Sequence, residues 1–313
     1  MGMDLKQIRY FVSIADCGNV SRAADILHVA QPSLSAQLRG LEESLGVQLF
    51  VRHHRGVTLT ELGRRFYEQA MSILNNVDFA TDLVRTQSRD PVGRITVGLP
   101  TSAARGLALR LVKSVAAKYP NVSVHIVEAM TGNLDEWLQA GKLDVALLSN
   151  PKAFENVVST ELMVEDLMLI VNRDAPLARR KQVEFQQILK QTFVLPSNSH
   201  VIRIVVQACA ARRGLKFDVA IDCDSLMGIV QLVRGGYCTI GPRFGVADEI
   251  AGGQLVAVPI VKPTPRWELS VMRSKRSINL RGSEAVAGVL ISEIRSMVQS
   301  GLWSARLKGG GDA

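Results

Sequence analysis

The stretch AQPSLSAQLRGLEESLG, residues 30–46, has the apolar rhythm of an amphipathic helix. Its four leucines recur at spacings of four, three and four residues, which places them on one face: Leu34, Leu38, Leu41 and Leu45. Gln31 is expected as the N-cap and Pro32 at the first helical position, where its missing N–H costs nothing. Several small polar side chains therefore lie at the start of a helix whose leucine face is expected to be buried.

The residues before this stretch predict two shorter helices and a tight turn. The first helix ends at Gly18 and carries an apolar stripe: Leu5, Ile8, Val12 and Ala15. Asn19 or Ser21 can cap a second helix over residues 22–27, and residues 28–30 form the turn. Two helices, a turn and a third helix make a helix-turn-helix pattern.

The residues after Gly46 predict a wing, a two-stranded hairpin beside the helices. Two short strands, 47–51 and 57–60, flank a turn rich in cations at residues 52–56. Arg52 and Arg55 lie where a hairpin tip could reach phosphates or a minor groove.

A long helix follows, capped by Thr60 and running from residue 61 to about residue 88. Seven apolar residues recur at heptad spacing along it: Leu62, Phe66, Ala70, Ile73, Val77, Ala80 and Val84. Such a seam suits pairing with a second copy of the chain, and this is the interpretation we favour. The alternative is that the stripe packs on its own domain.

Residues 5–66 resemble the N-terminal domain of the LysR-type transcriptional regulators. The shared motifs are paired alanines, Gln-Pro-Ser/Ala-x-Ser, x-x-Leu-Glu-x-x-Leu-Gly, Leu-Phe-x-Arg and Leu-Thr-x-x-Gly. One departure is Glu61-Leu62 before Gly63, where the family often has a small residue beside the glycine. Length and layout fit the family over the whole chain, and within the family the sequence is closer to the nitrogen-assimilation-control-like branch.

The resemblance implies that the third helix enters the major groove of promoter DNA. Gln can pair bidentately with adenine, Ser can bond a base or a phosphate, and a helix start favours phosphate. The alternative is that Gln31 and Ser33 only satisfy the free N–H groups of their helix. The residues expected at DNA are Ser21, Arg22, Gln31, Pro32, Ser33, Ser35, Ala36, Arg39, Arg52 and Arg55.

The remaining two hundred residues alternate strands with helices. Residues 89–93 break the long helix, and a β-α-β-α-β order follows and then restarts near residue 193, which predicts a mostly parallel sheet covered on both faces. Two such α/β lobes resemble the type 2 periplasmic-binding-protein fold, which is also the effector domain of the family. The expected domains are a winged helix-turn-helix at 1–60, a linker helix at 61–89, an effector domain at 90–303 and a flexible tail at 304–313. Within the effector domain, lobe one covers about 92–163 and 268–303, and lobe two covers about 164–267.

Two near copies of one turn, Leu-Pro-Thr-Ser and Leu-Pro-Ser-Asn-Ser, fall one in each lobe. Each puts hydroxyls and free N–H groups at a helix start, which suits an anion beyond the carboxyl end of a strand. Plain N-capping is the alternative for any single Ser or Thr. The residues expected at the effector are Pro100, Thr101, Ser102, Thr131, Asn198, Ser199, His200, Gly241, Pro242 and Phe244.

Composition limits these interpretations. The net charge is +8, yet residues 1–90 hold ten basic and ten acidic side chains, so the excess lies in the later 27 basic and 19 acidic ones. That excess is consistent with an organic anion as effector, although basic runs are more often solvated loops. No apolar run approaches the ~20 residues of a membrane span, and the N-terminus lacks a signal-peptide pattern, so we expect a cytoplasmic protein and no membrane partner.

The side chains that carry metal or catalytic chemistry show no motif. The four cysteines and five histidines have no metal-ligand spacing, and no dinucleotide, P-loop or nucleophile-elbow motif occurs. We therefore expect no metal, no cofactor and no enzyme activity. The favoured function is a dimeric or tetrameric transcription regulator, an activator or autorepressor, with a small-molecule effector between the lobes; the alternatives are a solute-binding protein and an α/β enzyme.

Overall fold

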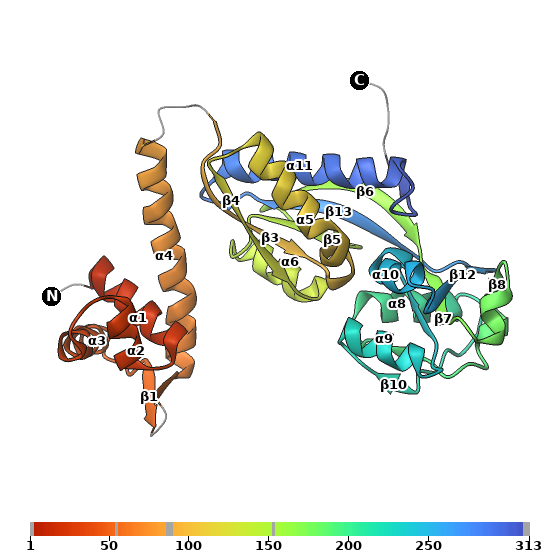
Figure 1. Ribbon diagram of the computed structural model, residues 1–313, viewed down its shortest axis with the longest axis horizontal. Helices are drawn as coiled ribbons and strands as arrows, with labels where there is room; N and C mark the ends of the chain where they lie inside the picture. The colour runs from red at the N-terminus through yellow and green to blue at the C-terminus, as the bar shows by residue number, and fades with distance from the viewer. Residues whose placement is uncertain (1–2, 54–55, 86–89, 152–153, 309–313) are drawn as a thin grey trace. The chain divides into compact units, whose positions relative to one another are not determined.

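The computed structural model describes residues 3–53, 56–85, 90–151 and 154–308, with the backbone alone at residues 75, 78–79 and 82–85. The chain divides into two compact units, Met1–Ser88 and Arg89–Ala313 (Figure 1). No helix in the described residues is both long enough and apolar enough to cross a membrane.

The N-terminal unit is a helix-turn-helix with a wing and a long final helix. In chain order its elements are α1 (Leu5–Cys17), α2 (Val20–Ile26), α3 (Gln31–Leu45), β1 (Phe50–His53), β2 (Gly56–Leu59) and α4 (Glu61–Arg85). Three leucines of the α3 stripe are buried as their spacing predicts, and Leu45 is half-buried against the same core, which includes Ile8, Phe11, Ile14, Leu34, Leu38 and Leu41.

The helix starts of this unit differ from expectation in one place. The Asn19 side chain caps α2, accepting hydrogen bonds from the backbone N–H groups of Ser21 and Arg22 at 2.9 and 3.1 Å. The N-cap of α3 is Ala30, with no side-chain hydrogen bond, so the expectation that Gln31 is the cap is wrong. Gln31 is instead the first residue of the helix. The preceding turn, in which His28 has a φ of 53°, ends one residue earlier than the sequence predicted.

The first strand of the wing hairpin begins later in the sequence than predicted. Strand β1 starts at Phe50 rather than residue 47, because Glu42 accepts the N–H groups of Val47 and Leu49 and so holds residues 47–49 to the end of α3. Strand β1 then runs through Arg52, which pairs with Val57, so Arg52 is a strand residue and not a turn residue. Arg55 lies outside the described residues.

Helix α4 begins at a side-chain cap, because the Thr60 hydroxyl accepts the N–H of Gly63 at 2.9 Å. A Cβ atom on Gly63 would collide with the Leu49 carbonyl oxygen, which explains the glycine of the Leu-Thr-x-x-Gly motif.

The first half of the α4 stripe packs on its own unit, as the alternative interpretation holds. The Phe66 ring lies 4.9 Å from the Phe11 ring, Ala70 is fully buried, and Ile73 packs on the same core. Leu62 is exposed, and the Val84 side chain lies outside the described residues.

A mixed six-stranded sheet forms the first lobe of the C-terminal unit. Its strand order is β14-β6-β13-β5-β3-β4, with β3, β4 and β5 parallel and β6, β13 and β14 antiparallel to their neighbours. The strands are β3 (Gly93–Leu99), β4 (Val122–Glu128), β5 (Val145–Ser149), β6 (Val157–Asp166), β13 (Arg266–Ser274) and β14 (Arg306–Leu307).

Alternation along β5 explains why helices cover both faces of this sheet. Val145 and Leu147 belong to one core cluster, and Ala146 and Leu148 to another. Helix α6 covers one face, and α5 packs beside α11 on the other. Their bounds are α5 (Thr101–Lys118), α6 (Thr131–Gln139) and α11 (Leu280–Gln299).

The second lobe holds a four-stranded sheet in the order β11-β7-β12-β8 and a parallel pair, β9 with β10. The strands are β7 (Met168–Asn172), β8 (Val183–Glu184), β9 (Val194–Leu195), β10 (Ile221–Asp222), β11 (Thr239–Gly241) and β12 (Leu255–Val261). The helices are η1 (Pro176–Arg179), α7 (Phe185–Ile188), α8 (Val201–Ala211), α9 (Leu226–Arg234), η2 (Arg243–Val246) and α10 (Ala247–Ala251). Sequence periodicity did not predict β6, β7 or β12.

The chain crosses between the lobes along β6 and β13 (Figure 1). The sequence predicted a flexible tail from residue 304, and this prediction is wrong for residues 304–308. Strand β14 pairs with β6, and Asp166 accepts hydrogen bonds from Arg306, so the chain is tied down there. Just before it, the buried Trp303 ring stacks on Phe244 at 4.1 Å. Residues 309–313 lie outside the described residues.

Candidate functional sites

The start of α3 presents polar side chains to solvent. Leu34 and Leu38 are buried, while the remaining face is exposed at Gln31, Pro32, Ser33, Ala36 and Arg39, with Ser35 half-buried. In the described part of the chain, no side chain caps the free N–H groups at this helix start. Gln31 and Ser33 therefore do not act as caps, which removes the plain structural alternative for them.

Three more of the expected DNA-facing residues lie on neighbouring elements. Ser21 and Arg22 are exposed in the first turn of α2, where their backbone N–H groups are held by Asn19. Arg52 is exposed on β1, next in the chain to Val51 and the buried Phe50 that anchors the strand. Arg55, the remaining wing residue, lies outside the described residues.

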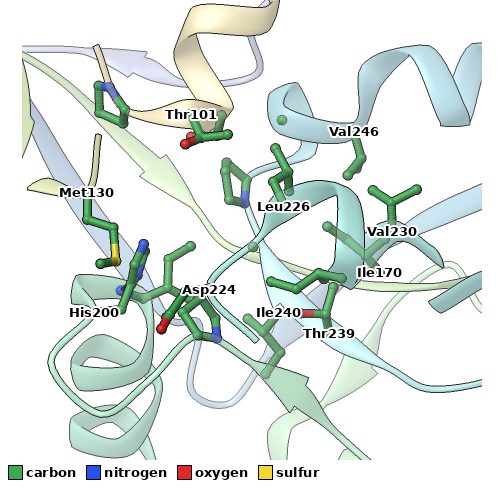
Figure 2. A pocket seen from close by; sticks show the side chains of 18 of the residues that line it. Thr101, Met130, Ile170, His200, Asp224, Leu226, Val230, Thr239, Ile240 and Val246 are labelled. Carbon is green, nitrogen blue, oxygen red and sulfur yellow. Dashed lines mark hydrogen bonds between the residues drawn. The ribbon is translucent and has the colours of Figure 1, made fainter. Parts of the chain in front are cut away.

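A cavity of the C-terminal unit lies between the lobes. Helices α5 and α6 of the first lobe and α8 and α9 of the second all begin at it. Figure 2 shows Thr101 and Met130 on one side and His200, Asp224 and Leu226 among the residues opposite. Seven of the expected effector residues line it: Pro100, Thr101, Ser102, Thr131, His200, Gly241 and Pro242.

Three expected residues lie elsewhere. Asn198 is exposed in the loop before α8, because that helix begins only at Val201. Phe244 is buried instead against Trp303, in space that Gly106 leaves open: a Cβ there would collide with the Phe244 ring. Ser199 lines a neighbouring, more open hollow.

Sequence reasoning missed most of the cavity wall, which is aliphatic. It includes Ile170, Leu226, Ile229, Val230, Val233 and Val246, with Trp267 where the lobes meet and the polar Asp224 and Thr239. Asp224 follows β10 and precedes the Ser225 cap of α9, so its place after a strand was the available signal. The aliphatic residues carry no signal that separates a ligand wall from an ordinary core.

The ionisable groups of the cavity are a neutral imidazole and a carboxylate. His200 Nδ1 accepts the N–H of Ile202 at 3.1 Å, and burial lowers the pKa of His200, so the ring is neutral near pH 7. The backbone N–H of Ser197 donates to Asp224 Oδ1 at 2.9 Å and lowers the pKa of that carboxyl. No lysine or arginine is among the described residues of the wall, so the expected anionic effector finds no cation there.

A winged helix-turn-helix joined to a two-lobed α/β unit with a cleft defines a DNA-binding transcriptional regulator with an effector-binding domain. Family models agree with this class. Residues 5–64 match the bacterial regulatory helix-turn-helix protein of the lysR family, and residues 88–301 match the LysR substrate binding domain. The chain belongs to the LysR family.

Relatives refine the place of the chain within the family. The nitrogen assimilation regulatory protein nac of Klebsiella aerogenes is 30% identical over 93% of this chain and 95% of its own length. Its Escherichia coli K12 counterpart is 31% identical over 95% and 97%. The chain is thus similar to the nitrogen-assimilation-control branch, as its sequence indicated.

Solved structures agree on the architecture. CbnR, a LysR family transcriptional regulator, is 22% identical and matches 94% of this chain and 99% of its own with a TM-score of 0.72, which supports the fold. Corynebacterium glutamicum OxyR is 27% identical over 96% and 97%, with a TM-score of 0.61.

Proposed function

We propose that this chain reads promoter DNA with the start of α3 and that a small molecule in the interlobe cleft controls it. The observation that carries the first part is the uncapped α3 start, where Gln31 and Ser33 are exposed above a buried leucine stripe. Exposed amide and hydroxyl groups beside free N–H groups suit base edges and phosphates. The segment has no excess of basic residues, so base contacts rather than bulk charge carry recognition, and Arg52 adds phosphate attraction.

The test is a gel shift of the full-length protein with the DNA upstream of its own gene. We expect a shift that unrelated competitor DNA does not abolish. Arg52→Ala should weaken binding to every DNA and lower the salt slope by about one, because one phosphate contact is lost. A complete absence of shift at low salt would overturn the proposal.

Self-association through α4 is part of the same proposal. The described α4 side chains that pack on the unit's own core reach as far as Leu74, and Val77 and Ala80 continue the apolar stripe beyond it. Pairing of two such helices gives a dimer, and dimers associate into a homotetramer. Light scattering of the full-length protein should show the larger species, and Val77→Glu should shift it toward the monomer.

Effector binding in the interlobe cleft controls how the protein binds DNA. Effector binding changes the closure of the lobes and so the spacing of the DNA-reading helices in the assembly. The regulator then activates a neighbouring operon or represses its own gene, and it does so in the cytoplasm, where promoter DNA is found.

A further inference from the structure

A buried carboxyl group lies where the chain crosses between the lobes. Glu165 of β6 is 1% exposed, and its cross-strand partner on β13 is Trp267. Glu165 Oε2 accepts a hydrogen bond from the indole N–H of Trp267 at 2.9 Å. Because Trp267 lines the interlobe cavity, this hydrogen bond joins an ionisable group to the cavity wall.

Burial controls the ionisation of Glu165. It raises the pKa of Glu165 to about 7, and the indole N–H groups of Trp267 and Trp303 lower the pKa by less. The cause is that water no longer solvates the negative charge and that no described lysine or arginine replaces the water. Near pH 7 the carboxyl group is therefore divided between its two protonation states, and each pH unit changes their ratio tenfold.

The charged groups around Glu165 leave its ionisation to burial. Asp166, the next residue of β6, is the charged group that acts on Glu165, and it raises the pKa further. Its side chain points to the opposite face of the sheet, where Arg266 of β13 and Arg306 of β14 pair with it at 2.7 and 2.9 Å. Cys209 of α8 stays neutral because burial raises the pKa of its thiol. The other charged side chains on β6, β13, α8, η2 and α11 do not act on Glu165: Glu161, Glu268, Arg273, Arg203, Arg243, Arg281, Glu284, Glu293 and Arg295.

The second oxygen of the carboxyl group lies near a second indole. Glu165 Oε1 and Trp303 Nε1 are both buried, and neither has a hydrogen-bond partner among the described residues. The two atoms are complementary, because a carboxylate oxygen accepts a hydrogen bond and an indole N–H only donates one. Glu165 therefore lies between two indoles and is hydrogen-bonded to one of them.

Trp303 belongs to a contact between the lobes. It follows α11 of the first lobe and stacks on Phe244 of η2 in the second lobe, with the ring centroids 4.1 Å apart. The two residues after Phe244, Gly245 and Val246, line the cavity. One oxygen of Glu165 is thus bonded to the cavity wall, and the other lies near the indole that joins the lobes.

The two protonation states act differently on these indoles. An ionised carboxylate has two acceptor oxygens, so it attracts the N–H groups of both Trp267 and Trp303. In the protonated form one oxygen carries a hydrogen and donates, so only the other oxygen remains to accept from Trp267. Loss of the proton therefore draws the Trp303 N–H toward Oε1, and uptake of the proton releases it.

We propose that Glu165 is a proton-linked positioning residue, which joins the Trp267 wall of the cavity to the Trp303–Phe244 contact between the lobes. Gain or loss of one proton changes both contacts, so the shape of the cavity depends on pH near neutrality. The inference rests on the proposed function in taking this cavity as the effector site. The proton-dependent change itself requires neither DNA nor effector.

The first test is a pH titration of the full-length protein across neutrality. Infrared difference spectra report a buried protonated carboxyl group through its C=O band, and tryptophan fluorescence reports the indoles. We expect both signals to change with a common midpoint of about 7. Glu165→Gln keeps an oxygen for the Trp267 N–H and cannot ionise, so it should abolish both changes.

Trp267→Phe tests the direction of the coupling. It removes a donor that favours the ionised form, so the midpoint should rise by roughly half to one pH unit, as the loss of one hydrogen bond implies. Trp303 remains as the fluorescent reporter. A contact with a structural role alone would change stability and leave the midpoint in place.

Two control variants separate Glu165 from other groups. Glu161→Gln changes an exposed carboxylate of the same strand, which pairs with Lys308 at 3.2 Å, and should leave the titration unchanged. His200→Asn should remove only a separate step below pH 6.5, because burial lowers the pKa of His200.

Three results would overturn the inference: no carboxyl band that titrates near neutrality in the wild type, a change that persists in Glu165→Gln, or a midpoint that does not rise in Trp267→Phe. If Glu165→Gln does not fold, the wild-type band and the Trp267→Phe midpoint still decide. A missing DNA shift together with the expected midpoints would instead overturn the regulator proposal and leave the proton-dependent change in place.

Discussion

Helix α2 begins with a side-chain cap, and helix α3, the next along the chain, begins without one. The same contrast runs through the other helices of eight or more residues in the described part of the chain. Side chains cap α1, α4, α8, α9 and α11 through Asp4, Thr60, His200, Ser225 and Asn279. Helices α3, α5 and α6 have no side-chain cap, and their N-cap residues are Ala30, Pro100 and Met130.

Uncapped helix starts keep N–H groups available to a partner, whereas capped starts do not, and both kinds occur around the cleft. A cap contributes about 1 kcal/mol, and its absence leaves N–H groups to water or to a ligand. The uncapped starts lie at the proposed DNA surface, for α3, and at the first-lobe side of the cleft, for α5 and α6. On the second-lobe side of the cleft, α8 and α9 begin with side-chain caps, and Asp224 lines the cavity there.

The largest effect is expected at a buried cap. Asn279 accepts the Gly282 N–H at 2.8 Å and donates to the Val92 carbonyl at 2.5 Å, and it is nearly inaccessible. Asn279→Ala removes both bonds and leaves buried partners unpaired, so thermal or urea unfolding should show a loss of about 2–4 kcal/mol. Asn133→Ala, exposed at the uncapped α6 start, is the control and should leave stability unchanged. Equal losses of stability in the two variants would contradict the difference between capped and uncapped helix starts.

The next effect concerns the uncapped start of α3. Gln31→Ala should leave the unfolding midpoint unchanged, because no cap is lost. It should relax sequence preference by about 1–3 kcal/mol if the amide pairs with one adenine. Competition gel shifts with single-base variants of the operator measure this. Unchanged selectivity would remove Gln31 from the DNA-reading set.

Asn19→Ala is the matched substitution at the neighbouring capped start. It removes the acceptor for the Ser21 and Arg22 N–H groups, so the N-terminal unit should lose about 1 kcal/mol of stability. The sequence preference of the folded protein should stay as in the wild type. Urea unfolding and the same competition assay measure both, and a change of preference without a stability loss would reverse the roles assigned to α2 and α3.

The smallest effect is a pH dependence of the α8 cap. The folded-state pKa of His200 is lowered from its usual 6.5 by burial, so the neutral ring stabilises the fold above pH 6.5. This contribution is lost as the pH falls from there through the folded-state pKa, because the unfolded chain takes up the proton first. His200→Asn keeps a cap acceptor without titrating, so unfolding measured across this range should be less pH-dependent. An identical pH profile would show that His200 does not couple the cap to protonation.

Patterns that span a few residues were readable in the sequence. The leucine stripe of α3 and the Asn19 and Thr60 caps depend on local geometry and nearby hydrogen bonds. The seven cavity residues that were expected follow from turns at the carboxyl ends of strands, where helix starts converge.

Contacts between distant segments decided the rest. Phe66 of the α4 stripe meets Phe11, and Phe244 fills the space beside Gly106, which no local pattern can specify. Strand β14 forms because it pairs with the edge of β6, and the cleft forms only when residues 130–136, 200 and 224 are brought together. The sequence by itself determined which helices start with polar groups; the tertiary structure decided what those starts face, because burial and charge depend on every element packed around them.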